Sequence, residues 1–199
     1  MKIRYSALTK LLLRPFLPDL RVNVVSELTP GMLKEAGITS VLLDVDCTLK
    51  RYDTDILEGE VQIWLETLKN TGIRVCLLSN GKGPRIGRFA ARYGLPFVAM
   101  ALKPMPFGCW RAVREQGWDG AKTAMVGDQI FADVMAGNLA GLTTILVTPI
   151  HPEMEPLFTR VKRPFEKIIL RAIPIQNAAE SPSHSRDGQA PPPKSPASP

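Results

Sequence analysis

The stretch Val41-Leu42-Leu43-Asp44-Val45-Asp46-Cys47-Thr48-Leu49 decides the fold and gives the first hypothesis about function. Its branched apolar residues predict a buried strand over 41–46 that ends in two carboxylates, Asp44 and Asp46. Because side chains alternate along a strand, residues two positions apart are expected on the same side. Two carboxylates that close repel each other unless a cation or a shared proton holds them. The alternative is a strand followed by an ordinary acidic turn, since Asp is a common turn former.

Strand and helix patterns alternate along the chain from residue 40 onward. Apolar residues at helical spacing predict helices over 58–71, 84–93, 106–116 and 130–139. In the third of these helices, Trp110 and Val113 are expected to face inward. Short apolar runs predict further strands over 73–78, 97–100, 123–126 and 143–147. This alternation predicts an α/β fold, a doubly wound, Rossmann-like parallel sheet with helices on both faces.

Length and composition predict one globular domain with an appendage. The chain has 199 residues, of which 45% are hydrophobic and 22% charged. We expect the domain over 1–174, and a disordered tail over 175–199 because that segment is rich in Pro, Ser and Ala. No window is apolar enough for a membrane-spanning helix, and the N-terminus does not resemble a signal peptide. The three cysteines lack metal-binding spacing, so a cytoplasmic protein with reduced thiols is predicted.

Basic residues gather at the two ends of the predicted domain, in 1–25 and 156–174. Apolar residues between Phe165 and Ile173 follow helical spacing with basic neighbours, so this segment could lie on an anionic membrane. The alternative is a helix packed on the sheet with a solvated basic face. Nucleic acid is not an expected partner, because the chain has no recognition motif beyond its charge.

Polar side chains follow four of the predicted strands at the point where each strand ends. In chain order these are Asp44 and Asp46, Ser79 and Asn80, Lys103, and Asp128 with Asp133 five residues later. The carboxyl ends of parallel strands meet at one edge of the sheet, where ligands bind in such folds. Carboxylates suit a divalent metal, and a lysine suits a phosphate. Alone, a Ser-Asn-Gly turn or a single lysine would carry no argument, so the inference depends on the combination.

In this order, the Asp44 stretch, Ser79-Asn80, Lys103-Pro104 and Gly127-Asp128 with Asp133 resemble the four motifs of the haloacid dehalogenase superfamily of phosphohydrolases. The resemblance covers about residues 15–150. A narrower set of segments resembles the bacterial YqeG branch, which is itself similar to the phosphatidylglycerophosphatases of mitochondria and plastids: Phe16-Leu17-Pro18-Asp19, Leu102-Lys103-Pro104, Val126-Gly127-Asp128-Gln129, Gly137-Asn138 and Thr144 to Ile150. Two positions depart from these relatives, since Cys47 and Gly81 stand where Asn is usual.

The resemblance implies an Mg²⁺-dependent phosphatase that works through an aspartyl-phosphate. Asp44 would be the nucleophile, and Asp46 the group that protonates the leaving oxygen and later deprotonates water. The implied metal ligands are Asp44, Asp128 and the backbone carbonyl of Asp46. Asp133 would act through water or from behind the direct ligands; alternatively it only complements a helix dipole.

The resemblance also implies how the phosphate is held. Ser79 and the Asn80 backbone would bind the phosphoryl oxygens, Lys103 would neutralise their charge, and Thr48 would fix the loop geometry. Cys47 could make the site sensitive to oxidation, although packing as a small hydrophobe is the favoured alternative.

The short interval between Thr48 and the helix predicted from residue 58 leaves no room for a cap domain. An uncapped site suits a large or membrane-embedded substrate. The substrate that the resemblance implies is phosphatidylglycerophosphate, an anionic phospholipid, cleaved at the cytoplasmic membrane face by a peripherally bound enzyme. A soluble phosphomonoester or a phosphoprotein is the alternative substrate. A receiver-like signalling domain, which is also doubly wound and phosphorylated on Asp, is the alternative that is not an enzyme.

Overall fold

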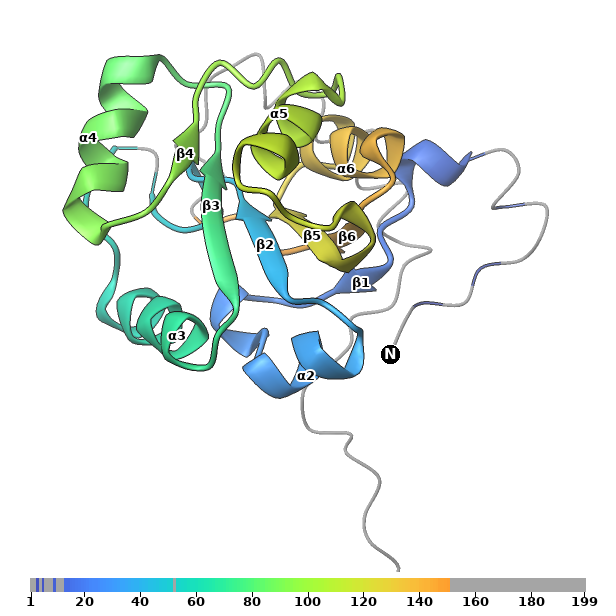
Figure 1. Ribbon diagram of the computed structural model, residues 1–199, viewed down its shortest axis with the longest axis horizontal. Helices are drawn as coiled ribbons and strands as arrows, with labels where there is room; N and C mark the ends of the chain where they lie inside the picture. The colour runs from blue at the N-terminus through green and yellow to red at the C-terminus, as the bar shows by residue number, and fades with distance from the viewer. Residues whose placement is uncertain (1–2, 4, 6–8, 10–12, 52, 151–199) are drawn as a thin grey trace, which may run out of the picture.

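The computed structural model describes residues 3, 5, 9, 13–51 and 53–150. Its centre is a six-stranded sheet in which every pair of neighbouring strands is parallel (Figure 1). The strands are β1 (Leu20–Arg21), β2 (Ser40–Leu43), β3 (Arg74–Leu78), β4 (Phe97–Val98), β5 (Thr123–Gly127) and β6 (Thr143–Leu146). Their order across the sheet is β1-β6-β5-β2-β3-β4. The predicted α/β fold with a doubly wound parallel sheet is confirmed.

The strand order reverses at β2, which lies between β3 and β5. Leu43 at the end of β2 is opposite Leu77 of β3 on one side and Val126 of β5 on the other. From β2 the chain continues outward through β3 and β4, and then returns to the opposite side of β2 to form β5 and β6. A crevice at the carboxyl ends of the strands is expected at such a reversal. The loops that follow β2 and β5 therefore begin side by side.

Helices cover both faces of the sheet. They are α2 (Pro30–Glu35), α3 (Gly59–Asn70), α4 (Gly83–Tyr93), α5 (Phe107–Glu115) and α6 (Met135–Ala140). Four shorter elements join them: η1 (Arg14–Phe16), η2 (Val25–Glu27), η3 (Gly120–Lys122) and the π-helical turn η4 (Ile130–Val134).

The core consists of two layers, one on each face, and β2 contributes to both because its side chains alternate. Val41 and Leu43 pack in the layer that contains the buried residues of α3, among them Leu65 and Leu68. Leu42 packs in the other layer, with residues of α5 and α6. Burying one such side chain contributes about 1.5–3 kcal/mol. All four residues of β2 are buried, so the strand that leads to Asp44 is held from both sides.

Several predicted bounds are confirmed to within about a residue, whereas others are wrong. The predicted strand over 41–46 ends at Leu43, and the one over 97–100 ends at Val98. The helix predicted over 130–139 begins as the π-helical turn η4 and becomes α-helical only at Met135. The short elements β1 and α2 were not predicted, because two to six residues carry too little periodicity to be recognised.

The prediction that Trp110 faces inward is wrong, since its side chain is half exposed. The buried residues of α5 are instead the small ones, Gly108, Cys109 and Ala112. A Cβ atom at Gly108 would overlap with the backbone of Ala101. The buried face of α5 therefore lies too close to the segment that carries Ala101 for an indole ring to fit there.

The proposed domain boundary near residue 174, the tail over 175–199 and the amphipathic segment Phe165 to Ile173 lie outside the described residues. Within the part of the chain that the structure describes, no helix is both long and apolar enough to cross a membrane.

Candidate active site

Three buried carboxylates meet where the strand order reverses. Asp44 follows β2 directly and Asp128 follows β5, while Asp133 lies in η4. The amide of Asp44 donates to the carbonyl of Val126 at 2.9 Å, which continues the β2–β5 pairing up to the site. Each of the three carboxylates offers one oxygen within 4.8 Å of the other two. The convergence expected from the strand ends is therefore present in the structure.

Lys103 reaches this cluster from the loop between β4 and α5. Its ammonium group donates to Oδ1 of Asp44 at 2.5 Å and to Oδ1 of Asp133 at 2.6 Å. A third bond, of 3.0 Å, goes to the carbonyl of Leu78 at the end of β3. All three hydrogens of the ammonium group are thus used, and the side chain is buried. Lys103 links the ends of β2, β3 and η4.

Burial and neighbouring charges both shift the pKa values of Asp44 and Lys103, and both values are raised. Desolvation raises the pKa of Asp44 well above its usual range; Lys103 opposes this rise, while Asp133 and Asp128 add to it. Desolvation would lower the pKa of Lys103, but the carboxylates of Asp133 and Asp44 outweigh it and leave that pKa raised. One lysine therefore does not fully compensate three clustered carboxylates. A further cation is the simplest way to keep them all ionised.

Asp133 lies closer to the centre of the site than the sequence suggested. It was expected to act through water or from behind the direct ligands, but one of its oxygens belongs to the carboxylate cluster. Its other oxygen, Oδ2, accepts a hydrogen bond from the amide of Gln129 at 3.0 Å, which fixes the carboxylate. A Cβ atom at Gly127 would overlap with this carboxylate. The glycine of the Gly127-Asp128 motif thus leaves space for Asp133.

Thr48 holds Asp128 rather than only shaping its own loop. Its hydroxyl donates to Oδ1 of Asp128 at 2.8 Å, and both side chains are buried. The loop that carries Thr48 is tight, since the amide of Cys47 donates to the carbonyl of Lys50 at 2.8 Å. Cys47 adopts a left-handed backbone with φ 64° and its side chain is buried. Burial agrees with the favoured alternative, in which Cys47 packs as a small hydrophobe.

Ser79 and Asn80 lie at the end of β3, beside Lys103. The amide of Gly81 donates to the hydroxyl oxygen of Ser79 at 3.0 Å. The side-chain amide of Asn80 bonds the backbone of Lys103 twice, through Oδ1 at 2.8 Å and Nδ2 at 2.9 Å. Asn80 therefore fixes the loop that carries Lys103, a contact that the sequence did not predict.

Asp46 does not join the carboxylate cluster through its side chain. Although β2 ends at Leu43, Val45 packs in the same core layer as Val41 and Leu43, so the alternation of side chains continues past the strand. Arg85, in the first turn of α4, donates to both oxygens of Asp46, at 2.8 and 2.5 Å. Lys50 donates to Oδ1 at 2.8 Å.

These two cations were missed by the sequence analysis. Burial would raise the pKa of Asp46, but the hydrogen bonds from Arg85 and Lys50 outweigh it and lower that pKa. Lys50 is buried and lies four residues after Asp46, but its neighbours Thr48, Arg51 and Asp53 are polar, so nothing in the sequence indicated its burial. Arg85 is 39 positions away from Asp46, and no local pattern connects the two.

The cluster fits a magnesium ion by its chemistry. Mg²⁺ prefers oxygen ligands and uses one or two protein carboxylates together with water and phosphate oxygens. Asp44, Asp128 and Asp133 provide carboxylate oxygens close enough to share one ion. The bond from Thr48 orients one of these ligands from behind, as expected around a metal site.

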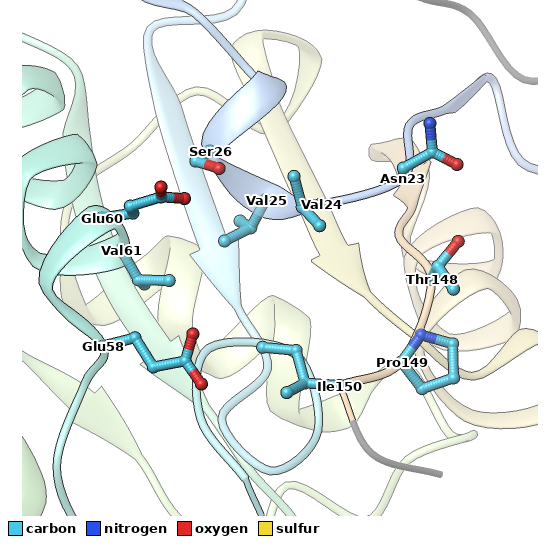
Figure 2. A pocket seen from close by; sticks show the side chains of 10 residues that line it. All are labelled: Asn23, Val24, Val25, Ser26, Glu58, Glu60, Val61, Thr148, Pro149 and Ile150. Atoms are coloured by element: carbon cyan, nitrogen blue, oxygen red, sulfur yellow. The ribbon is translucent and has the colours of Figure 1, made fainter.

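A separate pocket of about 360 Å³ lies beyond β1 and β6 (Figure 2). Residues after β1, at the start of α3 and after β6 line it, including Ser26, Glu58, Glu60 and Thr148. None of the predicted site residues is among its lining residues. The amide of Ile150, on its rim, donates to the carbonyl of Cys47 at 2.7 Å, so the pocket borders the loop after β2.

Comparison with known proteins agrees with this geometry. The family model for haloacid dehalogenase-like hydrolases matches residues 22–141. The probable phosphatase YqeG of Bacillus subtilis is 35% identical over 158 residues, which are 79% of this chain and 91% of that protein. Phosphatidylglycerophosphate phosphatase 1 of Arabidopsis thaliana is 26% identical over 78% of this chain, and the match spans 47% of the plant protein.

Solved structures are also similar. The cobalt-bound deoxy-D-mannose-octulosonate 8-phosphate phosphatase of Haemophilus influenzae is 21% identical, with a TM-score of 0.45 over 70% of this chain and 91% of that one. The predicted enzyme class, a phosphoric monoester hydrolase, is confirmed by the family and by the 35% identical relative. With its acidic cluster at the reversal of the strand order, the chain belongs to the haloacid dehalogenase-like hydrolases.

Proposed function

We propose that this enzyme is an Mg²⁺-dependent phosphomonoesterase in which Asp44 is transiently phosphorylated. The observation that carries the proposal is the buried cluster of Asp44, Asp128 and Asp133 with Lys103 between two of its members. A carboxylate can attack phosphorus only if the negative charge on the phosphoryl oxygens is neutralised. Bound Mg²⁺ would supply that neutralisation together with Lys103.

Each residue of the site has a role in this proposal. Asp44, Asp128 and the backbone carbonyl of Asp46 hold the metal, and Asp133 supports them directly or through water. Ser79 and the Asn80 backbone bind the phosphoryl oxygens. The side chain of Asn80 and the hydroxyl of Thr48 keep Lys103 and Asp128 in place.

Asp46 is the acid and base of the proposed reaction. Arg85 and Lys50 hold its carboxylate and favour the ionised form in the free enzyme. That form suits the second step, in which a base removes a proton from the water that attacks the phosphoryl-enzyme. In the first step Asp46 must carry a proton for the leaving oxygen, so its bonds to the two cations have to loosen when substrate enters.

The proposed substrate is phosphatidylglycerophosphate, which the enzyme would convert to phosphatidylglycerol. The similarity to the plant phosphatase of that name supports this choice. So does the absence of a cap, which is part of the proposal: residues 44–58 between β2 and α3, and 79–82 between β3 and α4, are short connections. An open site admits a lipid headgroup more readily than an enclosed one. The proposed enzyme is cytoplasmic and contacts the membrane peripherally. Its chain consists of a domain over 1–174 and a tail over 175–199.

Hydrolysis assays with and without Mg²⁺ test the proposal. The panel should include p-nitrophenyl phosphate, soluble phosphomonoesters, a phosphopeptide and phosphatidylglycerophosphate in mixed micelles. We expect turnover only with Mg²⁺, fastest with the lipid, and lost in the Asp44→Asn variant although its circular dichroism spectrum is unchanged. If a soluble ester is turned over faster than the lipid, that ester and not the lipid is the preferred substrate. Turnover by Asp44→Asn at the wild-type rate would refute the nucleophile, and a stable phosphorylated protein without turnover would favour the receiver-like alternative.

A further inference from the structure

The segment Met100–Trp110 carries the densest group of exposed large apolar side chains in the described part of the chain. The exposed fractions are 64% for Met100, 62% for Leu102, 41% for Met105, 56% for Phe107 and 50% for Trp110. Single exposed apolar residues are common on soluble proteins, but five within eleven positions are more than such scattered exposure. We call these five side chains the 100–110 surface.

The backbone of this segment is built to turn these side chains outward. Met100 and Leu102 have left-handed φ values of 50° and 58°, a conformation that is costly for residues other than glycine. Ala101, between them, is buried in the core. Two hydrogen bonds to the loop after β3 fix the arrangement: the amide of Met100 donates to Gly81 at 3.1 Å, and that of Ala101 to Ser79 at 3.0 Å. The exposure of Met100 and Leu102 thus comes from a fixed conformation.

The 100–110 surface borders the active site. Lys103, which bonds Asp44, lies between Leu102 and Met105 in the chain, and its side chain is buried while theirs are exposed. The segment follows β4 and therefore starts at the carboxyl edge of the sheet, like the catalytic loops; in Figure 1 it runs along the top of the molecule between β4 and α5. The rings of Phe107 and Trp110 are in edge-to-face contact, with centroids 5.9 Å apart.

Positive charge accompanies this surface. The sequence from Ser79 to Arg114 has seven basic residues and no acidic one, although the whole chain has a net charge of only +6. Five of these basic residues are exposed: Lys82, Arg88, Arg92, Arg111 and Arg114. Arg111 also pairs with the adjacent Glu115, at 3.5 Å. Apolar side chains with adjacent cations complement a bilayer that contains anionic lipids, because the former enter the acyl boundary and the latter meet the headgroups. Trp is favoured at that boundary.

We propose that the 100–110 surface is where the enzyme docks on an anionic membrane, with the catalytic edge of the sheet turned toward the lipid headgroups. This inference rests on the proposed function, since it explains how a phospholipid phosphate reaches Asp44. It differs from the expectation based on the basic ends of the chain, because it assigns binding to Met100, Leu102, Met105, Phe107 and Trp110. The competing partners for this surface are a second copy of the chain and a soluble protein.

The test uses the full chain and sedimentation with vesicles of phosphatidylcholine alone or with phosphatidylglycerol. We expect binding to the mixed vesicles only, weakened by salt. Phe107→Ser should weaken this binding about fivefold to tenfold, because it removes an aromatic side chain that would be buried in the membrane. Ile63→Ser is the matched control. Ile63 is 70% exposed on α3, and α3 covers the face of the sheet opposite to the one that α5 covers. Arg114→Glu should weaken binding, whereas Lys34→Glu on α2 should not.

Three outcomes would overturn the proposal. These are equal binding to both kinds of vesicle, equal binding by Phe107→Ser and Ile63→Ser, and a wild-type dimer that becomes a monomer in Phe107→Ser, which would assign the surface to a second copy. If Phe107→Ser does not fold, Arg114→Glu against Lys34→Glu decides the question. Turnover of p-nitrophenyl phosphate should be unchanged in all four variants. Vesicle binding that depends on Phe107, without hydrolysis of phosphatidylglycerophosphate, would refute the proposed substrate and leave the docking surface standing.

Discussion

The ammonium group of Lys103 lies 2.5 Å from Oδ1 of Asp44, although the two residues are 59 positions apart in the chain. Both side chains are buried. Asp133 accepts a second bond from the same ammonium group, so one cation serves two of the three clustered carboxylates. The ammonium group of Lys103 therefore provides less positive charge than the three clustered carboxylates would carry when ionised. This arrangement supports the proposal that the site holds a divalent cation and transfers a phosphoryl group.

The bond from Thr48 to Asp128 is expected to affect metal binding. Thr48→Val keeps the shape of the side chain but removes the hydroxyl that donates to Oδ1 of Asp128. Losing such a supporting bond typically weakens metal affinity about 10- to 100-fold. We expect the Mg²⁺ concentration for half-maximal turnover to rise within that range. Thr67→Val, at an exposed position on α3, removes a hydroxyl that bonds only its own helix and should change nothing.

The close approach of Gly127 to Asp133 provides a second test. Gly127→Ala places a Cβ atom against the carboxylate of Asp133, which must move away from Lys103 and the cluster. We expect weaker activation by Mg²⁺ and about tenfold or more lower turnover. Gly83→Ala is the control, because a Cβ atom there meets nothing within 4 Å. Wild-type activation of the Gly127→Ala variant would show that Asp133 is not needed in its observed position.

Arg85 is predicted to position Asp46. Arg85→Gln removes two hydrogen bonds to that carboxylate. Because the proton transfer depends on its orientation, we expect kcat to fall about tenfold with little change in KM. Arg88→Gln changes an exposed arginine of the same helix and should leave kcat unaffected. A rise in KM with unchanged kcat in Arg85→Gln would instead assign Arg85 to substrate binding.

Stability should depend on pH in a direction set by Asp44. Its pKa is raised by burial and by its two carboxylate neighbours, so without a metal the folded state holds a proton that the unfolded state has lost. The free energy of unfolding in EDTA should therefore fall as pH rises above the ordinary Asp pKa of about 3.9. Asp46, whose pKa is lowered, acts in the opposite sense and destabilises the fold only at lower pH.

In the proposed site Mg²⁺ would bind the ionised carboxylates, so the gain in melting temperature that it produces should be larger at about pH 8 than at about pH 5. The Asp44→Asn variant should show a weaker decline of stability with pH in EDTA. Thermal unfolding followed by circular dichroism measures both effects. Equal stabilisation by Mg²⁺ at the two pH values would contradict the assignment of the raised pKa to a metal-binding carboxylate.

The sequence was sufficient to predict five of the six strands and the group of residues at the edge of the sheet. Strands such as β2 and β5 are short apolar runs, and the polar residues that follow them must meet because the strands are parallel. This is why Asp44, Asp128, Asp133 and Lys103 could be placed together without coordinates.

The sequence was not sufficient where contacts depend on tertiary packing. The partnership of Asp46 with Arg85 joins a loop to the first turn of a helix, and no local pattern encodes it. The outward position of Trp110 follows from the close packing of Gly108 on Ala101, which a periodicity of 3.6 residues does not reveal. The left-handed backbone of Met100 and Leu102, which creates the 100–110 surface, is equally invisible in the sequence.

The most direct measurement is to locate the phosphoryl group during turnover. The enzyme is mixed with Mg²⁺ and a good substrate, quenched in acid within the first turnovers, digested and analysed by peptide mass spectrometry. We predict a phosphoryl group on Asp44 that disappears when unlabelled substrate is chased through, and none when EDTA replaces Mg²⁺. Phosphorylation of another residue, or rapid turnover without any phosphorylated peptide, would contradict the central claim that Asp44 is the nucleophile of a metal-dependent phosphatase.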